Sequence, residues 1–160
     1  LRPLIEVHYP TTGVRGVMGS SMGGLVSLHM ALDDPEAYAF VASLSGTLGW
    51  GRFAADGPIL QERYLAADPL DTVVYVDSGG GPGADGCTDP DGDGFVVDDP
   101  DDSDNFCVNR AFADALADHG YTWGETLHHW HAPGAAHNEA AWADRVGRPV
   151  DVFLELADAE

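Results

Sequence analysis

The sequence contains no lysine, and its seven basic residues are all arginines. Against these stand 27 acidic residues, so the formal net charge is −20. A surface with such an excess of negative charge repels nucleic acids and anionic lipids, which argues against both as binding partners. Long apolar runs are also missing, since none approaches the roughly 18 residues that a membrane-spanning helix needs. We therefore expect neither a nucleic-acid partner nor a membrane span.

Cysteine is scarce as well, with only Cys87 and Cys107 in the chain. The pair encloses most of residues 85–104, a segment that contains nine aspartates and no basic residue. In an exported protein the two cysteines would form a disulfide that closes a loop of about 20 residues and stabilises the fold by about 3 kcal/mol. In a cytosolic protein they would be unrelated thiols. Because they bracket the acidic segment, we expect the disulfide and treat residues 85–107 as an insert in a single domain.

The chain of 160 residues is 44% hydrophobic, which suits one folded domain with a core. Short β-branched stretches alternate with stretches of helical periodicity. Strands are expected at residues 14–18, 40–44, 73–76 and 126–130, and helices at 22–32, 59–67, 106–119 and 139–146, the last resuming after Pro149. Strands that alternate with helices predict an α/β fold with a mostly parallel sheet.

A candidate nucleophile lies between the first expected strand and the helix after it. Residues 19–23 read GSSMG and match the pattern G-x-S-x-G, in which Ser21 has the required spacing and Ser20 does not. The serine of this pattern lies on a strained turn, and only glycine lets the neighbouring backbone pass so closely. The amide of Met22 would donate to a developing oxyanion. The alternative is a Gly/Ser turn without chemistry.

Among seven histidines, His137 is the candidate base. It follows a strand and a Pro-Gly-Ala-Ala loop and precedes a helix, a position that gives the exposure a catalytic histidine needs. A loop histidine that is merely solvated is the simpler alternative. His128 and His129 lie on the strand expected at 126–130 and His131 directly follows it; they would be partly buried or, as a further alternative, bind a metal.

Two segments resemble motifs of one enzyme family. Residues 17–25 read VMGSSMGGL, similar to its nucleophile region, and residues 133–142 read PGAAHNEAAW, similar to its histidine region, in which a polar residue and a Trp follow Gly-x-x-His. This esterase family of α/β-hydrolases includes esterase D, feruloyl esterases, enterochelin esterases and mycolyltransferases. The resemblance covers residues 1–84 and 105–155, and it implies the C-terminal part of an α/β-hydrolase fold that needs no cofactor for catalysis.

The resemblance also implies an acid between these motifs, after the strand at 73–76 and just before a helix. Here the acidic insert separates those two landmarks, so that Asp85 satisfies the first and Asp104 the second. Asp104 precedes His137 by 33 residues, which suits one helix, one strand and a loop, and we favour it. Some members of the family work with a Ser-His pair, in which case neither aspartate is needed.

The family fold implies parts that precede Leu1. An oxyanion hole needs two N–H donors, and the second usually comes from a loop after an early strand. The first strands of the sheet would also be missing, which would leave an open sheet edge. We therefore interpret residues 1–160 as a fragment of the catalytic domain, whose expected partner is the N-terminal remainder of the same protein.

The acidic insert resembles the start of a calcium-binding loop. When positions are counted from Asp89, carboxylates stand at positions 1, 3 and 5 and a glycine stands at position 6. In a calcium-binding loop this spacing lets oxygen ligands converge on one cation. Position 12 is Pro100, so the usual bidentate acid is absent, and the loop is more similar to thrombospondin type 3 and dockerin repeats than to an EF-hand. A solvated acidic loop is the alternative. The expected ligands of a structural Ca²⁺ are Asp89, Asp91, Asp93, Phe95 through its carbonyl, Asp98 and Asp99, with Asp101 as another substitute.

Together these features predict a serine ester hydrolase that acts through an acyl-enzyme on a small-molecule, carbohydrate or siderophore ester. A hydrolase fold without activity, serving as a surface or binding module with a calcium-stabilised loop, is one alternative. An acyltransferase is another. Calcium and a disulfide both indicate a periplasmic or extracellular protein.

Overall fold

The computed structural model describes residues 2–49, 59–83, 86–87 and 104–159 of the chain. Its centre is a four-stranded parallel sheet in the order β1-β2-β3-β4, which confirms the predicted fold class. The strands are β1 (Gly16–Ser20), β2 (Phe40–Leu44), β3 (Val73–Ser78) and β4 (Leu127–His131). The helices are α1 (Arg2–His8), α2 (Met22–Asp33), α3 (Leu60–Ala66), α4 (Phe106–Asp118), α5 (Glu139–Ala143) and α6 (Gly147–Ala159), with a 3₁₀ turn at Pro35–Ala37.

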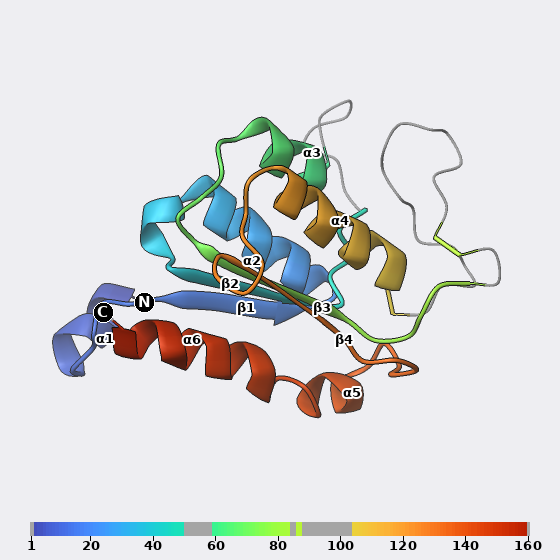
Figure 1. Cartoon of the computed structure of the whole chain (residues 1–160). Coiled ribbons are helices and arrows are strands. Elements are labelled where there is room, and N and C mark those ends of the chain that lie inside the picture. Colours follow the sequence, from blue (N-terminus) through green and yellow to red (C-terminus); the bar gives the residue numbers. More distant parts are fainter. Residues whose placement is uncertain (1, 50–58, 84–85, 88–103, 160) are drawn as a thin grey trace.

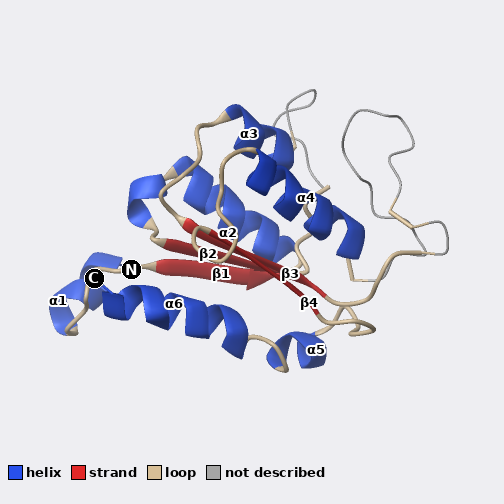
Figure 2. Ribbon diagram, in the orientation of Figure 1, coloured by secondary structure: helices blue, strands red, loops and turns tan. Residues whose placement is uncertain are grey.

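Helices cover both faces of the sheet (Figures 1 and 2). On one face α2, α3 and α4 enclose a core in which Val41, Val74 and Val76 of the strands meet the helices. On the other face α6 covers a smaller cluster that includes Phe40 and Tyr75. The two central strands, β2 and β3, are buried along their whole length. This two-sided burial explains why both strands are rich in apolar residues.

The parallel register gathers the ends of all four strands at one edge. Ser20 pairs with Leu44, Leu44 with Asp77, and Ser78 with His131. The segments that leave these strands therefore start side by side, although they are far apart in the sequence. In open α/β sheets, ligands bind in the crevice at this carboxyl edge.

The last helical region differs from the expectation that it would pause at Pro149. The chain breaks earlier, after α5 ends at Ala143, and α6 already begins at Gly147. Pro149 thus lies in the first turn of α6. A proline is tolerated there because the N–H groups of the first turn have no partner within the helix.

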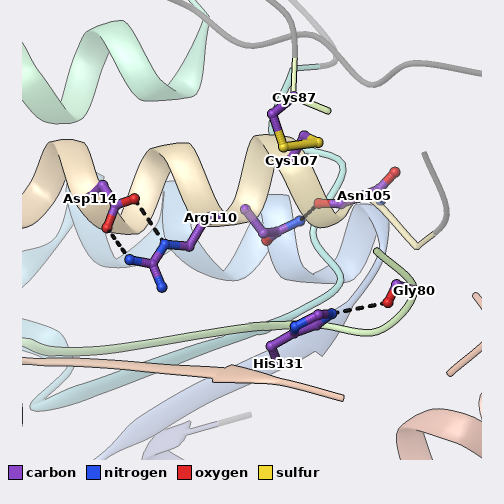
Figure 3. The surroundings of a disulfide bond; sticks show 8 residues. Gly80, Cys87, Asn105, Cys107, Arg110, Asp114 and His131 are labelled. Carbon is purple, nitrogen blue, oxygen red and sulfur yellow. Dashed lines mark hydrogen bonds and ion pairs between the residues drawn. A yellow bond between two sulfur atoms is a disulfide. The ribbon is translucent and has the colours of Figure 1, made fainter. Parts of the chain in front are cut away.

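The structure contains the predicted disulfide between Cys87 and Cys107, with 5.3 Å between the two Cα atoms (Figure 3). It joins the chain that follows β3 to the first turn of α4. Within the described ranges, no helix combines the length and apolarity required to cross a membrane. Several predicted residues lie outside the described ones, namely Asp85, Asp89, Asp91, Asp93, Phe95, Asp98, Asp99 and Asp101.

Candidate active site

Ser21 occupies a strained turn that joins β1 directly to α2. Its φ of 55° and ψ of −124° lie in a region that residues other than glycine rarely adopt. The Ser21 amide donates to the carbonyl of Leu44 at 2.9 Å, so the turn is attached to the end of β2. The Ser21 carbonyl accepts from the amides of Gly24 and Leu25 at 3.0 and 3.2 Å. The backbone strain is therefore maintained by contacts on both sides of the serine.

The strand can meet the helix this closely because of Gly19. A Cβ atom on Gly19 would lie 2.4 Å from the carbonyl carbon and oxygen of Gly23. Gly24 has a similar role, since a Cβ there would lie 2.4 Å from Oγ of Ser43 on β2. At Gly23 itself, an added Cβ would meet nothing within 4 Å. The steric requirement of the motif thus falls on its first glycine and on the glycine after its last position.

His137 lies in the loop between β4 and α5, next to Ser21. Its Nε2 is 2.9 Å from Oγ of Ser21, and its ring meets Trp142 edge-on, with 5.0 Å between the ring centroids. The side chain is 35% exposed, which leaves room for a substrate. The Asn138 side chain accepts from the amide of Ala141 at 3.0 Å and caps α5, so the backbone next to His137 is fixed.

Asp104 is the acid that the structure brings to His137. Its Oδ1 is 2.8 Å from Nδ1 of His137, and its side chain is fully buried. Its backbone has a positive φ of 63°, and the same holds for Asn105 with 56°. The Asn105 amide group donates to the carbonyl of Ser45 at 2.9 Å, which attaches this turn to the end of β2. The other predicted acid, Asp85, lies outside the described residues.

These contacts assign the proton positions on the imidazole. A carboxylate only accepts, so Nδ1 of His137 carries the hydrogen and donates it to Asp104. Nε2 is then free to accept the hydroxyl hydrogen of Ser21. The Met22 amide is at the N-terminus of α2, where the helix dipole favours negative charge. The arrangement is able to activate a serine hydroxyl as a nucleophile.

Three further residues surround Asp104 that the sequence interpretation missed. Ser45 directly follows β2, Asp77 lies near the end of β3, and Arg145 follows α5. All three residues are buried. Burial raises the pKa of Asp77 to about 6, although the guanidinium of Arg145 acts in the opposite direction. An aspartate at the end of an apolar strand was a usable signal for Asp77. Trp142, the tryptophan of the histidine motif, packs against the cluster on the α6 face and donates to Oγ of Ser45 at 3.2 Å.

The three histidines of β4 do not converge on one point. His131 hydrogen-bonds the carbonyl of Gly80 at 3.0 Å and stacks near Phe106 of α4 (Figure 3 shows the Gly80 contact). Burial lowers the pKa of His129 to about 4, so this ring is neutral. His128 has its side chain on the opposite face of the strand from these two, because side chains alternate. The described part of the chain holds no group of three or more histidine, cysteine or acidic residues placed to bind a metal.

A parallel sheet with helices on both faces, a serine on the strand-to-helix turn and a histidine after the last strand together define an α/β-hydrolase. Comparison with protein families places the chain more narrowly, because residues 1–146 match the family described as "Putative esterase". The chain belongs to this esterase family, as the resemblance implied.

Solved structures with the same fold include several esterases. The enterochelin esterase of Shigella flexneri is 20% identical, with a TM-score of 0.64 over 94% of this chain and 34% of its own. An IroE-like serine hydrolase from Shewanella oneidensis is 22% identical, with a TM-score of 0.64 over 95% of this chain and 44% of its own. A ferulic acid esterase is 17% identical, with a TM-score of 0.67 over 98% of this chain and 58% of its own. The chain therefore spans between a third and three fifths of the length of these neighbours.

Proposed function

We propose that the protein is a serine carboxylic-ester hydrolase that acts through an acyl-enzyme. The observation that carries the proposal is the continuous hydrogen-bond chain from Ser21 through His137 to Asp104, with distances of 2.9 and 2.8 Å. The strained backbone of Ser21, which exposes its hydroxyl at the carboxyl edge of the sheet, supports the same role.

In the proposed reaction, Nε2 of His137 takes the proton of the Ser21 hydroxyl while Oγ attacks the ester carbonyl. The Met22 amide and the N-terminus of α2 stabilise the resulting oxyanion. The C–O bond to the alcohol then breaks, and the imidazolium returns its proton to the leaving alkoxide. A water molecule, deprotonated by His137, attacks the acyl-enzyme; the bond from the acyl carbon to Oγ of Ser21 breaks, Oγ takes the proton back from His137, and the acid is released. Asp104 keeps the imidazole oriented and stabilises its protonated form throughout.

Ser21→Ala tests the proposal in the protein as it is naturally produced. We expect hydrolysis of p-nitrophenyl acetate to fall by at least about 1000-fold, because the nucleophile is gone. Ser20→Ala is the matched control, since it removes the neighbouring hydroxyl and should leave the rate within a few-fold. Undiminished hydrolysis by Ser21→Ala would show that this serine is not the nucleophile.

Two alternatives make different predictions for the same preparation. A fluorophosphonate probe labels Ser21 in an active hydrolase but not in a surface module without activity. Added glycerol diverts the acyl group to glycerol ester in an acyltransferase, whereas a hydrolase releases mainly the free acid.

Enterochelin and ferulic acid esters are suitable first substrates, because structural neighbours are named for them.

We also propose that the protein works in the periplasm or outside the cell. The disulfide between Cys87 and Cys107 supports this, because such bonds persist in oxidising compartments. A structural Ca²⁺ in the acidic insert stays a prediction from the sequence, since its expected ligands lie outside the described residues.

A further inference from the structure

A buried arginine connects two buried aspartates beneath the proposed active site. Arg145 is 4% exposed, and its Nε donates to Oδ1 of Asp77 at 3.0 Å. Its Nη2 donates to Oδ2 of Asp104 at 3.0 Å and also to Oγ of Ser45. Nη1 donates to the carbonyl of Ala141 in α5 at 3.3 Å. The guanidinium therefore spans β3, α5 and the turns that follow β2 and precede α4.

The neighbours of Ser45 determine where its hydroxyl hydrogen goes. Oγ of Ser45 accepts hydrogen bonds from the side-chain N–H groups of Trp142 and Arg145, which can only donate. Its own hydrogen is therefore directed to Oδ2 of Asp104, at 2.7 Å. The Gly79 amide donates to the same oxygen. Oδ2 thus has three donors, and Oδ1 remains for Nδ1 of His137.

We infer that Arg145 is a positioning residue for the catalytic acid: together with Ser45 it holds Oδ2 of Asp104 so that Oδ1 faces His137. This inference rests on the proposed hydrolase function. A carboxylate with one oxygen fixed by three donors cannot rotate without losing them in a buried site, where unpaired polar groups are costly. The orientation of the imidazole then follows from the orientation of the carboxylate.

Asp77 has a separate, electrostatic role in the same cluster. A lone guanidinium beside Asp104 would cancel the negative charge that stabilises the imidazolium of His137. Asp77, whose side chain is fully buried, offsets the charge of Arg145, so the cluster keeps one net negative charge when both carboxylates are ionised. Among the described residues, two more titratable or charged groups act on this cluster: Tyr75, whose hydroxyl donates to Asp77 at 3.4 Å, and Arg148 of α6, which acts on Tyr75.

The geometric part of the inference is tested by Arg145→Lys in the protein as it is naturally produced. Lysine keeps the charge, but its single ammonium cannot reproduce the planar fork between two carboxylates. We expect kcat for p-nitrophenyl acetate to fall about 10- to 100-fold, with KM within about twofold, because only the alignment of the base changes. Rates are expressed per site titrated with fluorophosphonate, so a loss of folded protein does not count as a loss of kcat.

Arg110→Lys is the matched control. Arg110 also makes a bidentate contact to an aspartate, since its Nε and Nη2 each donate to a carboxylate oxygen of Asp114 at 2.8 Å. This pair, however, is exposed on α4 (Figure 3). The control should keep the kcat of the unchanged protein. An Arg145→Lys variant with the same kcat as Arg110→Lys would overturn the inference.

The electrostatic part is tested by the pH profile of kcat/KM. Asp77→Asn leaves the guanidinium uncompensated, so the acidic limb should move to lower pH by about one pH unit. Combining Asp77→Asn with Arg145→Gln removes one charge of each sign. The acidic limb should then return to its position in the unchanged protein, while kcat stays below that of the unchanged protein. A purely structural role for Arg145 predicts no movement of the limb in Asp77→Asn, and that result would refute the charge balance.

The proton NMR signal of the His137–Asp104 hydrogen bond separates this inference from the hydrolase proposal, because it needs no turnover. We expect this far-downfield resonance in the unchanged protein and in Arg110→Lys, and its loss or displacement in Arg145→Lys. If no ester is hydrolysed but the resonance responds in this way, the positioning role stands and the proposed reaction fails. If Arg145→Lys does not fold, Ser45→Ala removes one donor to Oδ2 and must also weaken the resonance; an unchanged signal would contradict the inference.

Discussion

Gly19→Ala is the sharpest steric test of the turn that carries Ser21. The new methyl group would lie 2.4 Å from the carbonyl carbon and oxygen of Gly23 and 2.9 Å from its Cα. Ordinary van der Waals contact begins at 3.4 Å, so β1 and the first turn of α2 must separate by about 1 Å. Both partners are backbone, so no flexible side chain is available to move aside.

The separation has consequences for both stability and rate. Overpacking of this kind costs about 1–3 kcal/mol. With a urea dependence of about 2 kcal/mol per molar, the midpoint of unfolding should fall by about 0.5–1.5 M. Ser21 lies between the two elements that move apart, and a misplacement of about 1 Å at a reacting group lowers kcat about 100-fold.

Urea unfolding followed by tryptophan fluorescence measures the first effect, and p-nitrophenyl acetate hydrolysis per fluorophosphonate-reactive site measures the second. Gly23→Ala is the stability control, because the same methyl group would meet nothing within 4 Å there. Alanine also has the better helix propensity, so this control should unfold at the same or a higher urea concentration. Equal unfolding midpoints for the two variants would refute the close approach of Gly19 to Gly23.

Two further predictions concern stability. Because burial raises the pKa of Asp77 from 3.8 to about 6, the folded state binds this proton more tightly, and the contribution of Asp77 to the free energy of unfolding should decline by about 3 kcal/mol as the pH rises from 4 to 6. Asp77→Asn lacks this contribution, so urea midpoints of the two proteins between pH 4 and 7 should diverge; parallel profiles would contradict the burial argument. Replacing Cys87 and Cys107 by serine opens a loop with a sequence separation of 20 and should lower the free energy of unfolding by about 3 kcal/mol, measured by urea titration under non-reducing conditions. An unchanged urea midpoint would show that closing the loop with the disulfide does not stabilise the folded state.

Much of the architecture was predictable because its signals are local. The strand at Phe40–Leu44 is a short apolar run buried on both faces, and its observed bounds match the predicted ones. The helix after Ser21 differs from its prediction by one residue, since its periodicity and its Asp-Pro end are both local. The pause near Pro149 was misplaced, because the effect of a proline depends on where the helix starts.

The cluster around Asp104 shows what local signals leave out. Arg145 meets Asp77 and Asp104 across 68 and 41 residues of sequence, and nothing near it in the chain marks it as buried. Ser45 is an ordinary residue in a polar stretch until the fold places it between Arg145 and Trp142. Such contacts depend on the order of the strands, which periodicity does not specify.

The bond between Cys87 and Cys107 gives the acidic segment an unusual freedom to change. With its two ends held 5.3 Å apart at the Cα atoms, the intervening chain can vary in length or composition at a small entropic cost. Asp104 stands three residues before Cys107 and is held from the other side by Gly79, so such changes need not reach the acid. Homologues of this protein can therefore be expected to carry quite different loops between Cys87 and Asp104, and this position is a natural place to graft a foreign peptide.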